Sequence, residues 1–565
     1  MSDNGFIQVI LPLRLDWNPT YVLQEGQSVR TGDRIRVSFA SREYIGVVCN
    51  TGVDIRPAAG RTTAGTTTLP AGTTTLPAGT ATPPAGTTTL PAGTTTPPAG
   101  TATPPAGTTT LPVGTTTPPA GTTTLPAGKV LPVISTEGPA PVSGDELRLW
   151  EFVSSYYMCT IGEVYRAAYP SGLVNCELKK ARGEVRSTPP PAPRLNAREK
   201  DAVREILQHF QDGRTVLLET SSRMGIYSEL IRRALESGKD VLLMRPGSSP
   251  NLFGCSLKYR PETTASRRRD TARALRDCPG QFVEGGRSSV FLPFRNLGLV
   301  IVDGEHSPEY KQSSPAPRYN ARDVAVVLAG IHGASVLLCS ETPSLDSEYN
   351  CLTGKYDKVV SADGTLREAE VVDTGAERRK NGMIGNFSRI LLGKMQRTLD
   401  SGKKVLLLQP WEDTSDAEIE ARTHFPKAGG KINAMPLRRL TGPEADKYAL
   451  VALLNADYLL SRDNLRADER TYQLLYELGR KCRGELLIQS SRPLALSGNC
   501  NMVESLLADR KAFNLPPFTR EIDILGRKSE IIRRVFLPKD KNLQASKEKL
   551  RAEAGKFAIF DVDPK

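Results

Sequence analysis

Four short segments carry the residues that could do chemistry, and the first of them follows an apolar run. In VIVDGEH, Asp303 stands where a strand would end, and Glu305 and His306 follow shortly after. A carboxylate at such a strand end can hold magnesium, and an adjacent one orients the attacking water in phosphoryl transfer. Gly304 offers no carboxylate at that adjacent position, and Glu305, displaced by one residue, is expected to point elsewhere. The alternative is a strand end without chemistry.

The second segment, VLLETSSRMGIYSEL, has the context of a phosphate-binding loop: an apolar strand, a short loop and a helix. Such a loop needs glycines so that its amides approach phosphate, and a Lys followed by Ser or Thr for phosphate and magnesium. Ser222, Arg223 and Met224 stand at the start of the helix instead. Arg223 could supply positive charge, but a methionine cannot hold the metal. The alternative is a simple strand–helix connection.

The remaining two segments could join two lobes of a protein. CSETPSLDSEY (339–349) is a strand-end loop in which Thr342–Ser344 could couple the lobes. YELGRKCRG places Arg480 and Arg483 three residues apart, so the two could share a helical or turn face and reach a phosphate across a cleft. A solvated charged face is the alternative for this arginine pair.

Two stretches mix Arg and Lys with Tyr, at 256–280 and 310–323. Tyr can stack on unpaired bases while the cations hold phosphates, so these stretches are candidates for binding nucleic acid. The alternative is a solvated basic face. The candidate DNA-binding residues in and near the second stretch are Arg287, Tyr310, Lys311, Arg318, Tyr319 and Arg322.

The elements that must position these residues follow a β/α pattern. Short apolar strands alternate with helices over 196–361 and again over about 387–510, which predicts parallel sheets with sites at the strands' carboxyl ends. Alternating apolar and polar residues before residue 52 and after 128 predict a β-rich N-terminal region. The tail, with NLPPFTREIDI and FAIFDVDPK, predicts a small α+β domain. The fold class is therefore α/β.

A low-complexity insert interrupts the N-terminal region. Residues 65–128 hold nine tandem copies of a heptapeptide such as GTTTLPA. Pro in every copy excludes a coiled coil, and the tract has too few large apolar residues to offset its ordering entropy. We expect an extended or disordered insert, with a β-solenoid as the alternative. The predicted parts are an N-terminal domain (1–175) with the insert at 61–128, a linker (176–195), lobe 1 (196–361), a truncated lobe 2 (362–510) and a C-terminal domain (511–565).

The amino-acid composition indicates which binding partners and which cellular compartment to expect. The 565-residue chain has a formal charge of +12 and a pI of about 9.2, which favours an anionic partner such as nucleic acid. Its nine cysteines include no CxxC pair and it has four His, so we expect no zinc cluster and reduced cytoplasmic thiols. No signal peptide and no membrane span is expected.

Together these segments resemble the replication-restart primosomal PriA family. Residues 286–330 are similar to that family's motif II region, and LLNADYLLSRDNLRADERTYQLLYELGRKCRG is similar to its motif VI region. FVSSYYMCTIGEVYRAAYPSGL, FNLPPF and the closing DVDP also match its signatures. The family is a superfamily-2 DNA helicase, so the resemblance implies two RecA-like lobes, an N-terminal DNA-binding domain that recognises a 3′ DNA end, and assembly with primosome proteins and the replicative helicase.

The resemblance also implies site residues, and several of them depart from the family's pattern. The 3′-end pocket would use Thr20 and Tyr21 after Pro19, the loop after Phe39, and Lys129. The family has an aromatic residue where Pro19 stands and Gly after Phe39, where this chain has Ala. ATP and magnesium would be the family's cofactors, but the phosphate-loop Lys and Thr are Arg223 and Met224, the catalytic Glu is Gly304, and the family's zinc-binding insert is absent.

These departures predict a PriA-like protein that binds forked or single-stranded DNA and promotes primosome assembly without ATP-driven unwinding. Losing the phosphate loop, a metal ligand and the water-orienting carboxylate together should abolish turnover, because each group is typically worth orders of magnitude in rate. No cofactor or metal site is predicted. Two alternatives stay open: a residual ATP-dependent 3′→5′ helicase, which Asp303, Arg480 and Arg483 would support, and a non-functional remnant.

Overall fold

A computed structural model of the chain describes residues 5–52, 130–179, 185–247, 249–361, 369–440, 442–460, 465–491, 501–555 and 558–564. Within these ranges, the residues up to Thr51 and from Leu131 onward belong to one compact unit. The heptapeptide insert and Lys129 lie outside the described residues. None of the described helices has the length and apolar character needed to cross a membrane.

The N-terminal region is a closed five-stranded barrel with strand order β1-β2-β5-β3-β4. Alternate residues of β1 and β3, such as Ile7, Val9 and Val37, are fully buried inside it, as the period of two predicts. The strand that follows the insert pairs with β2 and with β3. The prediction that strands on both sides of the insert share one sheet is therefore confirmed. The strands are β1 (Phe6–Ile10), β2 (Thr20–Val22), β3 (Arg34–Phe39), β4 (Arg42–Thr51) and β5 (Leu131–Ser135).

Three short helices follow the barrel, and capping boxes begin the first two. The Ser143 side chain accepts from the amide of Glu146, whose carboxylate accepts from the Ser143 amide, and Thr160 and Glu163 repeat the arrangement. Each box satisfies amides that have no partner within the helix. The helices are α1 (Gly144–Tyr156), α2 (Ile161–Ala168) and α3 (Ser171–Glu177).

Lobe 1 is a seven-stranded parallel sheet with the order β12-β6-β11-β10-β7-β9-β8. Its central strand, LGLVIVD, is buried on both faces: Leu299 and Ile301 pack on one side, and Val300 and Val302 on the other. The strands are β6 (Thr215–Glu219), β7 (Asp240–Met244), β8 (Leu257–Tyr259), β9 (Phe282–Gly285), β10 (Leu297–Asp303), β11 (Ser335–Ser340) and β12 (Tyr356–Val360).

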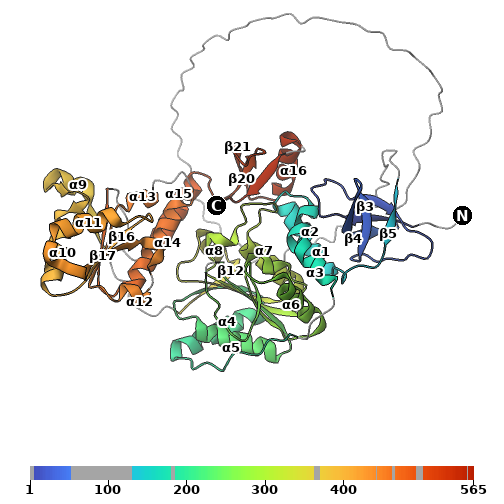
Figure 1. Cartoon of the computed structure of the whole chain (residues 1–565), viewed down its shortest axis with the longest axis horizontal. Helices are drawn as coiled ribbons and strands as arrows, with labels where there is room; N and C mark the ends of the chain where they lie inside the picture. Colours follow the sequence, from blue (N-terminus) through green and yellow to red (C-terminus); the bar gives the residue numbers. More distant parts are fainter. Residues whose placement is uncertain are drawn as a thin grey trace, which may run out of the picture. The chain divides into compact units, whose positions relative to one another are not determined.

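Helices cover both faces of this sheet, as expected for a parallel sheet. Helices α4 and α5 lie together on one face and α6 and α7 on the other (Figure 1). The helices of lobe 1 are α4 (Ala197–Gln211), α5 (Met224–Glu236), α6 (Ala265–Asp277), α7 (Ala321–His332) and α8 (Leu345–Leu352).

Lobe 2 is a second parallel sheet, of five strands in the order β13-β19-β18-β16-β17. With lobe 1 it makes the α/β fold with two RecA-like lobes that the sequence predicts. Its strands are β13 (Glu370–Asp373), β16 (Val405–Gln409), β17 (Ile432–Pro436), β18 (Leu450–Leu453) and β19 (Glu485–Ser490), with a small hairpin of β14 (Met383–Ile384) and β15 (Phe387–Ser388). Its helices are α9 (Thr374–Lys380), α10 (Arg389–Asp400), α11 (Ser415–His424), α12 (Gly442–Ala445), α13 (Asp457–Leu460), α14 (Ala467–Lys481) and α15 (Asn501–Ala512).

The C-terminal region is a three-stranded antiparallel sheet with one helix, which is the small α+β domain expected from the tail. Its strand order is β21-β20-β22. The elements are β20 (Thr519–Leu525), β21 (Ile531–Pro538), α16 (Leu543–Ala554) and β22 (Ile559–Val562). Ile522 and Val562 of this sheet pack in the same core cluster as the helices α1, α2 and α7.

Candidate functional site: the carboxyl edge of lobe 1

The candidate site residues of lobe 1 meet at one edge of its sheet. Asp303 ends β10, and the neighbouring strands β7 and β11 run parallel to it, so their carboxyl ends open at the same edge. Arg245 directly follows β7, and Arg223 stands at the start of α5, after β6. Because strand ends of a parallel sheet gather there, residues from distant segments become neighbours.

The carboxylate of Asp303 is fully engaged by donors of the chain itself. Arg223 Nε lies 2.7 Å from Oδ1, and Arg245 Nε lies 3.0 Å from Oδ2. The hydroxyl of Tyr227 donates to Oδ1 at 3.0 Å. Burial and then the charge of Asp303 raise the pKa of Tyr227 well above its usual value, so this hydroxyl is a neutral donor. Asp303 is only 2% exposed, which makes the cluster a buried ion-pair network.

Arg245 extends this network deeper into the lobe. Its Nη1 lies 3.6 Å from Glu284 Oε1, and both side chains are almost completely buried. Glu284 in turn accepts from the amides of Leu252 and Phe253 at 2.8 and 3.2 Å. Lys258 Nζ also lies 2.7 Å from Glu284, and Arg223 Nη1 lies 3.2 Å from Glu341. Three cations and three carboxylates therefore pair with one another within the protein, as buried charges require.

The side chains at this edge do not fit a magnesium–nucleotide complex. The carboxylate expected to hold the metal already binds two guanidinium groups, those of Arg223 and Arg245. In the loop before α5, Thr220 Oγ1 donates to Ser361 O at 2.7 Å and Ser222 Oγ donates to Glu199 at 2.7 Å. Met224, 41% exposed, has no oxygen to offer a metal.

The turn after Asp303 explains the glycine at position 304. Its φ is +63°, in the left-handed region that favours glycine. Glu305 is 2% exposed and accepts from the Ser344 amide at 2.6 Å and the Ser347 hydroxyl at 2.8 Å. Arg322 Nη1 lies 3.1 Å from the same carboxylate. The expectation that Glu305 points away from the Asp303 carboxylate is confirmed, because it holds the loop after β11.

His306 and that loop contact helix α14 of lobe 2. His306 Nδ1 lies 2.6 Å from Ser340 Oγ, and Nε2 lies 3.4 Å from Glu477. Burial by itself lowers the pKa of His306, but the hydrogen bond to Glu477 and the nearby carboxylates raise it above its ordinary value. Gln473 Nε2 donates to Pro343 O at 3.2 Å, and the Leu345 amide donates to Glu469 at 2.9 Å. The loop at 342–344 therefore couples the two lobes, as its position predicts.

The two arginines of the motif VI region do not share a face. Arg480 lies within α14, where its Nη2 donates to the Tyr476 hydroxyl at 3.1 Å and its guanidinium stacks over that ring. Arg483 follows the end of the helix, has an 85% exposed side chain and pairs with Asp446 at 3.3 Å. The prediction of a joint phosphate-binding pair is therefore corrected, since the helix ends between them.

Comparisons with known proteins find sequence similarity to replication restart proteins. The replication restart protein PriA of Rickettsia felis is 31% identical over 281 residues, which cover 47% of this chain and 43% of that protein. The PriA of Rickettsia typhi is 25% identical over 500 residues, which cover 68% of this chain and 76% of that protein. This chain is similar to PriA proteins. The match spans less than half of the R. felis relative.

No protein-family model matches this chain. Among solved structures, the DUF1998 helicase MrfA bound to DNA and AMPPNP is 13% identical, with a TM-score of 0.33 over 60% of this chain and 55% of that one.

The aromatic residues of the predicted DNA-binding loop are buried in the protein. Tyr310 and Tyr319 are each 1% exposed. The Tyr310 hydroxyl donates to the carbonyl oxygen of Asp303 at 2.6 Å, and the Tyr319 ring packs edge-on against Phe291. A buried ring cannot stack on a base, so the prediction for these two residues is wrong. Tyr310 instead supports the end of β10, and Tyr319 packs in the core beside Phe291.

The predicted DNA-binding cations also bind other groups of the chain itself. Lys311 Nζ lies 2.6 Å from Asp561 and Arg318 Nη1 lies 3.8 Å from it, so the loop binds the C-terminal DVDP segment. Arg322 is bound to Glu305, and Arg287 Nη1 donates to the carbonyl oxygen of Lys311 at 3.2 Å. Lys311, Arg318 and Arg322 are buried, so their assignment as phosphate contacts is corrected to a structural role.

The residues predicted to form a 3′-end pocket in the barrel also differ from the expectation. Tyr21 is 1% exposed, its hydroxyl donates to Ser38 O at 3.0 Å, and burial raises its pKa to about 12. It is a core residue of the barrel, not an exposed ring. Thr20 is half-buried on β2, and Ala40 and Ser41 form the left-handed turn after Phe39. Lys129 lies outside the described residues.

Sequence reasoning missed Tyr227, Arg245, Glu284 and the acidic face of α14. One signal was present for Arg245, because a charged residue that directly follows a strand as apolar as VLLM must find a buried partner. For the other missed residues, no local sequence pattern distinguishes a side chain that pairs within the fold from one that is solvated.

Among the described residues, no group of three or more His, Cys, Asp or Glu side chains stands together as metal ligands would.

Proposed function

We propose that this chain is a cytoplasmic DNA-binding protein of replication restart, which recognises stalled or abandoned forks and promotes primosome assembly without ATP-driven unwinding. The DNA partner and the restart role rest on the similarity to PriA proteins and on the net charge of +12. Forked or single-stranded DNA is the nucleic-acid partner, and primosome proteins with the replicative helicase are the protein partners.

One observation carries the proposal that fuelled unwinding is absent: Arg223 and Arg245 occupy both oxygens of the Asp303 carboxylate. A motor of this kind must hold two phosphates, bind magnesium, orient water and neutralise charge from the second lobe. In this chain, arginines of the protein neutralise the Asp303 carboxylate that would bind the metal, and Gly304 carries no carboxylate. The two arginines of the second lobe are separated, because α14 ends between them. The same internal pairing argues against a non-functional remnant, because unpaired buried charges would be strongly destabilising.

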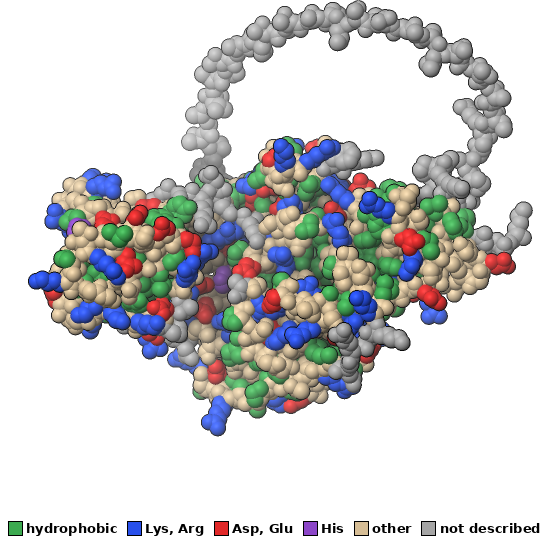
Figure 2. Space-filling model, in the orientation of Figure 1, with side chains coloured by type: hydrophobic (Ala, Val, Ile, Leu, Met, Phe, Trp, Pro, Cys, Tyr) green, Lys and Arg blue, Asp and Glu red, His purple; other side chains and the backbone are tan. Residues whose placement is uncertain are grey.

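DNA binding by the described surface is expected to be distributed. On the face shown in Figure 2, Lys and Arg side chains are interspersed with Asp and Glu rather than gathered into one patch. Binding should still weaken with salt, because each neutralised phosphate releases counterions, with a log–log slope of roughly −0.7 per phosphate on single strands.

The test uses the purified full chain. Fluorescence anisotropy with a labelled fork between about 50 and 200 mM salt should give binding that weakens as salt rises. Phosphate release from ATP, with and without the fork, should stay at background. Elemental analysis of the same chelator-free sample should find no stoichiometric zinc, as we propose for the cysteines.

Two outcomes would contradict the proposal. Absence of fork binding at low salt would remove the DNA-binding function. Fork-stimulated phosphate release that co-elutes with the chain through two chromatography steps and disappears in Asp303→Asn would instead support the residual helicase.

A further inference from the structure

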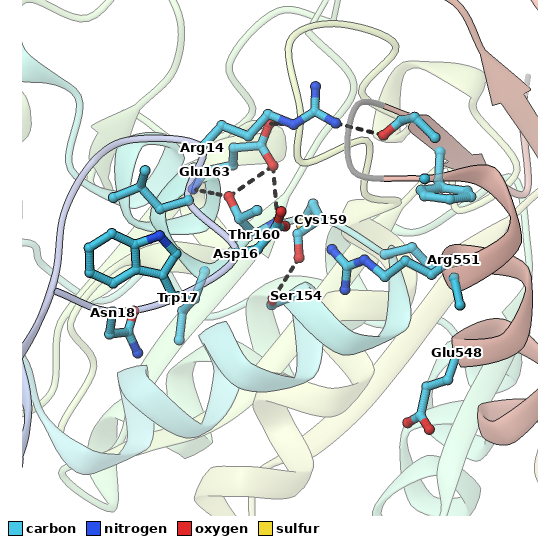
Figure 3. A pocket seen from close by; sticks show the side chains of 17 residues that line it. Arg14, Asp16, Trp17, Asn18, Ser154, Cys159, Thr160, Glu163, Glu548 and Arg551 are labelled. Atoms are coloured by element: carbon cyan, nitrogen blue, oxygen red, sulfur yellow. Dashed lines mark hydrogen bonds and ion pairs between the residues drawn. The ribbon is translucent and has the colours of Figure 1, made fainter. Parts of the chain in front are cut away.

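A pocket of about 660 Å³ lies where three distant parts of the chain meet. Its walls are the loop of residues 14–18 between β1 and β2, the junction of α1 and α2, and the end of α16 with the start of β22 (Figure 3). The size falls within the range of about 300–1,000 Å³ that is common for ligand sites. None of the residues predicted from the sequence as functional lines it.

The walls of this pocket are held by specific contacts. Arg14 Nη2 donates to the carbonyl oxygen of Ala558 at 2.6 Å, and Arg14 Nε lies 3.9 Å from Glu163. Glu163 also accepts from the Thr160 amide and hydroxyl at 2.9 and 3.0 Å. Ser154 Oγ donates to Cys159 O at 2.7 Å. The charges of Arg14 and Glu163 are thus used to build the pocket and not left for a ligand.

Three other groups of the pocket are left for a ligand. The ring of Trp17 is 56% exposed, although a side chain this large is usually well buried. Arg551 on α16 is exposed, and Asp16 lies near the centre of the view in Figure 3. Arg551 stands on the opposite side of the pocket from Trp17. Among the described residues, the side chains of Arg551 and Asp16 have no hydrogen-bond or ion-pair partner.

These three groups match the three parts of a nucleotide. An indole ring stacks on the face of a base, and an arginine binds phosphate. A carboxylate accepts from the exocyclic amino group of a base, as Asp and Glu do with cytosine. The remaining charged group of the lining, Glu548, accepts from Gln544 at 3.1 Å and is directed away from the pocket in Figure 3.

We propose that this pocket binds one unpaired nucleotide of single-stranded DNA, with the base on Trp17, the phosphate at Arg551 and the amino group of a cytosine or adenine at Asp16. The inference rests on the proposed DNA-binding function and adds a site to it. The pocket combines the N-terminal barrel loop with the C-terminal domain, so a strand bound there contacts both ends of the chain.

The experiment measures binding of fluorescein-labelled dC12 and dT12 to the full chain by anisotropy. Trp17→Ala should weaken binding of dC12 roughly 5- to 100-fold, because base–aromatic stacking is worth about 1–3 kcal/mol per base. The matched control is Trp411→Ala, which removes a 37% exposed tryptophan of lobe 2 and should leave binding unchanged.

A second pair of variants tests the phosphate contact. Arg551→Ala should reduce the log–log salt slope by about 0.7, as expected for one lost phosphate contact. Lys549→Ala removes an exposed charge from the same helix outside the pocket lining and should leave the slope unchanged. Asp16→Asn should remove a preference for dC12 over dT12.

The outcomes separate this inference from the proposed function. Binding that is equal in Trp17→Ala and Trp411→Ala, or equal effects of Arg551→Ala and Lys549→Ala, would overturn the pocket assignment while DNA binding stands. Equal affinity of the parent for dC12 and dT12 would overturn the role of Asp16. Absence of DNA binding in the parent would remove the proposed function together with this site.

Discussion

The carboxyl edge of lobe 1 and the pocket beside Trp17 differ in how their charges are satisfied. At the edge of lobe 1, Asp303 is 2% exposed and both its oxygens are bound by arginines of the same chain. In the pocket, the side chains of Asp16 and Arg551 have no partner among the described residues, and Trp17 is 56% exposed. The first region satisfies its charged groups within the protein. The second leaves groups for a ligand.

This difference shows why residue type alone is a poor guide to function. An aspartate at a strand end and an aspartate in a surface loop are chemically equal. The first stabilises the fold because it is buried with its counterions, and the second is available because it is not. The same substitution made in both regions should therefore distinguish a structural aspartate from one that is available to a ligand.

The largest difference is expected from Asp303→Ala compared with Asp16→Ala. Removing Asp303 leaves the buried Arg245 without one of its carboxylate partners, so the free energy of unfolding should fall by roughly 3–5 kcal/mol. Asp16→Ala should change it by less than about 0.5 kcal/mol, as for an ordinary surface residue. Urea unfolding followed by circular dichroism measures both. Equal losses in the two variants would show that Asp303 is no more structural than Asp16.

A smaller effect on stability is expected from Gly304→Glu. This substitution introduces, directly after Asp303, the carboxylate that an active helicase carries. The residue has φ +63°, so a side chain there should cost roughly 1 kcal/mol of stability. Phosphate release should stay absent, because Arg223 still occupies Asp303.

Gly330→Glu is the control for that substitution. Gly330 is an exposed position of α7 where an added Cβ meets no atom within 4 Å, so Glu should stabilise the helix by roughly 0.5–1 kcal/mol. ATP turnover in Gly304→Glu would show that the site at the edge of lobe 1 still accepts a nucleotide.

The contact between the lobes should make stability depend on pH by up to about 1 kcal/mol. The pKa of His306 is raised in the folded state, so its contribution is complete below the ordinary value of about 6.5 and is lost as the pH rises through the raised value. The pKa of Glu477 is lowered, so this partner stays ionised throughout that range. Melting temperatures at pH 6 and pH 8.5 should therefore differ less in His306→Gln than in the parent.

His332 gives a control of opposite sign. Burial lowers its pKa, so its contribution is present above the ordinary value and is lost as the pH falls. His332→Gln should reduce the loss of stability on the acid side. Identical pH profiles in the parent and in His306→Gln would contradict an ionic contact between His306 and Glu477.

The smallest effect is expected from removing the heptapeptide insert. Replacing residues 65–128 by a short Gly–Ser linker should change the free energy of unfolding by less than about 1 kcal/mol, because closure entropy grows only logarithmically with loop length. Strands β4 and β5 on its two sides both pair with β3, so a short linker can join them. DNA binding should be retained. A variant that unfolds the barrel would show that the repeats are part of its structure.

Some of these features could be predicted from the sequence because they are local. Strands such as LGLVIVD and VLLLQP are recognisable as apolar runs. The residue types alone show that Gly304 carries no carboxylate and that Met224 carries no oxygen for a metal. Even the direction of Glu305 followed from its displacement by one residue. By contrast, Tyr310, Tyr319 and Lys311 have a composition typical of a DNA-binding loop, and nothing in their immediate sequence shows that the fold buries them.

The sequence by itself determined the α/β fold class, the resemblance to PriA and the residue types at the expected nucleotide-site positions, such as Gly304 and Met224. Only the tertiary structure decided which charges are satisfied. Arg223 meets Asp303, Lys311 meets Asp561, and Arg14 meets Ala558, each across a long stretch of chain. Local pattern encodes the periodicity of strands and helices, whereas the burial and pairing of a charge depend on segments that only folding brings together.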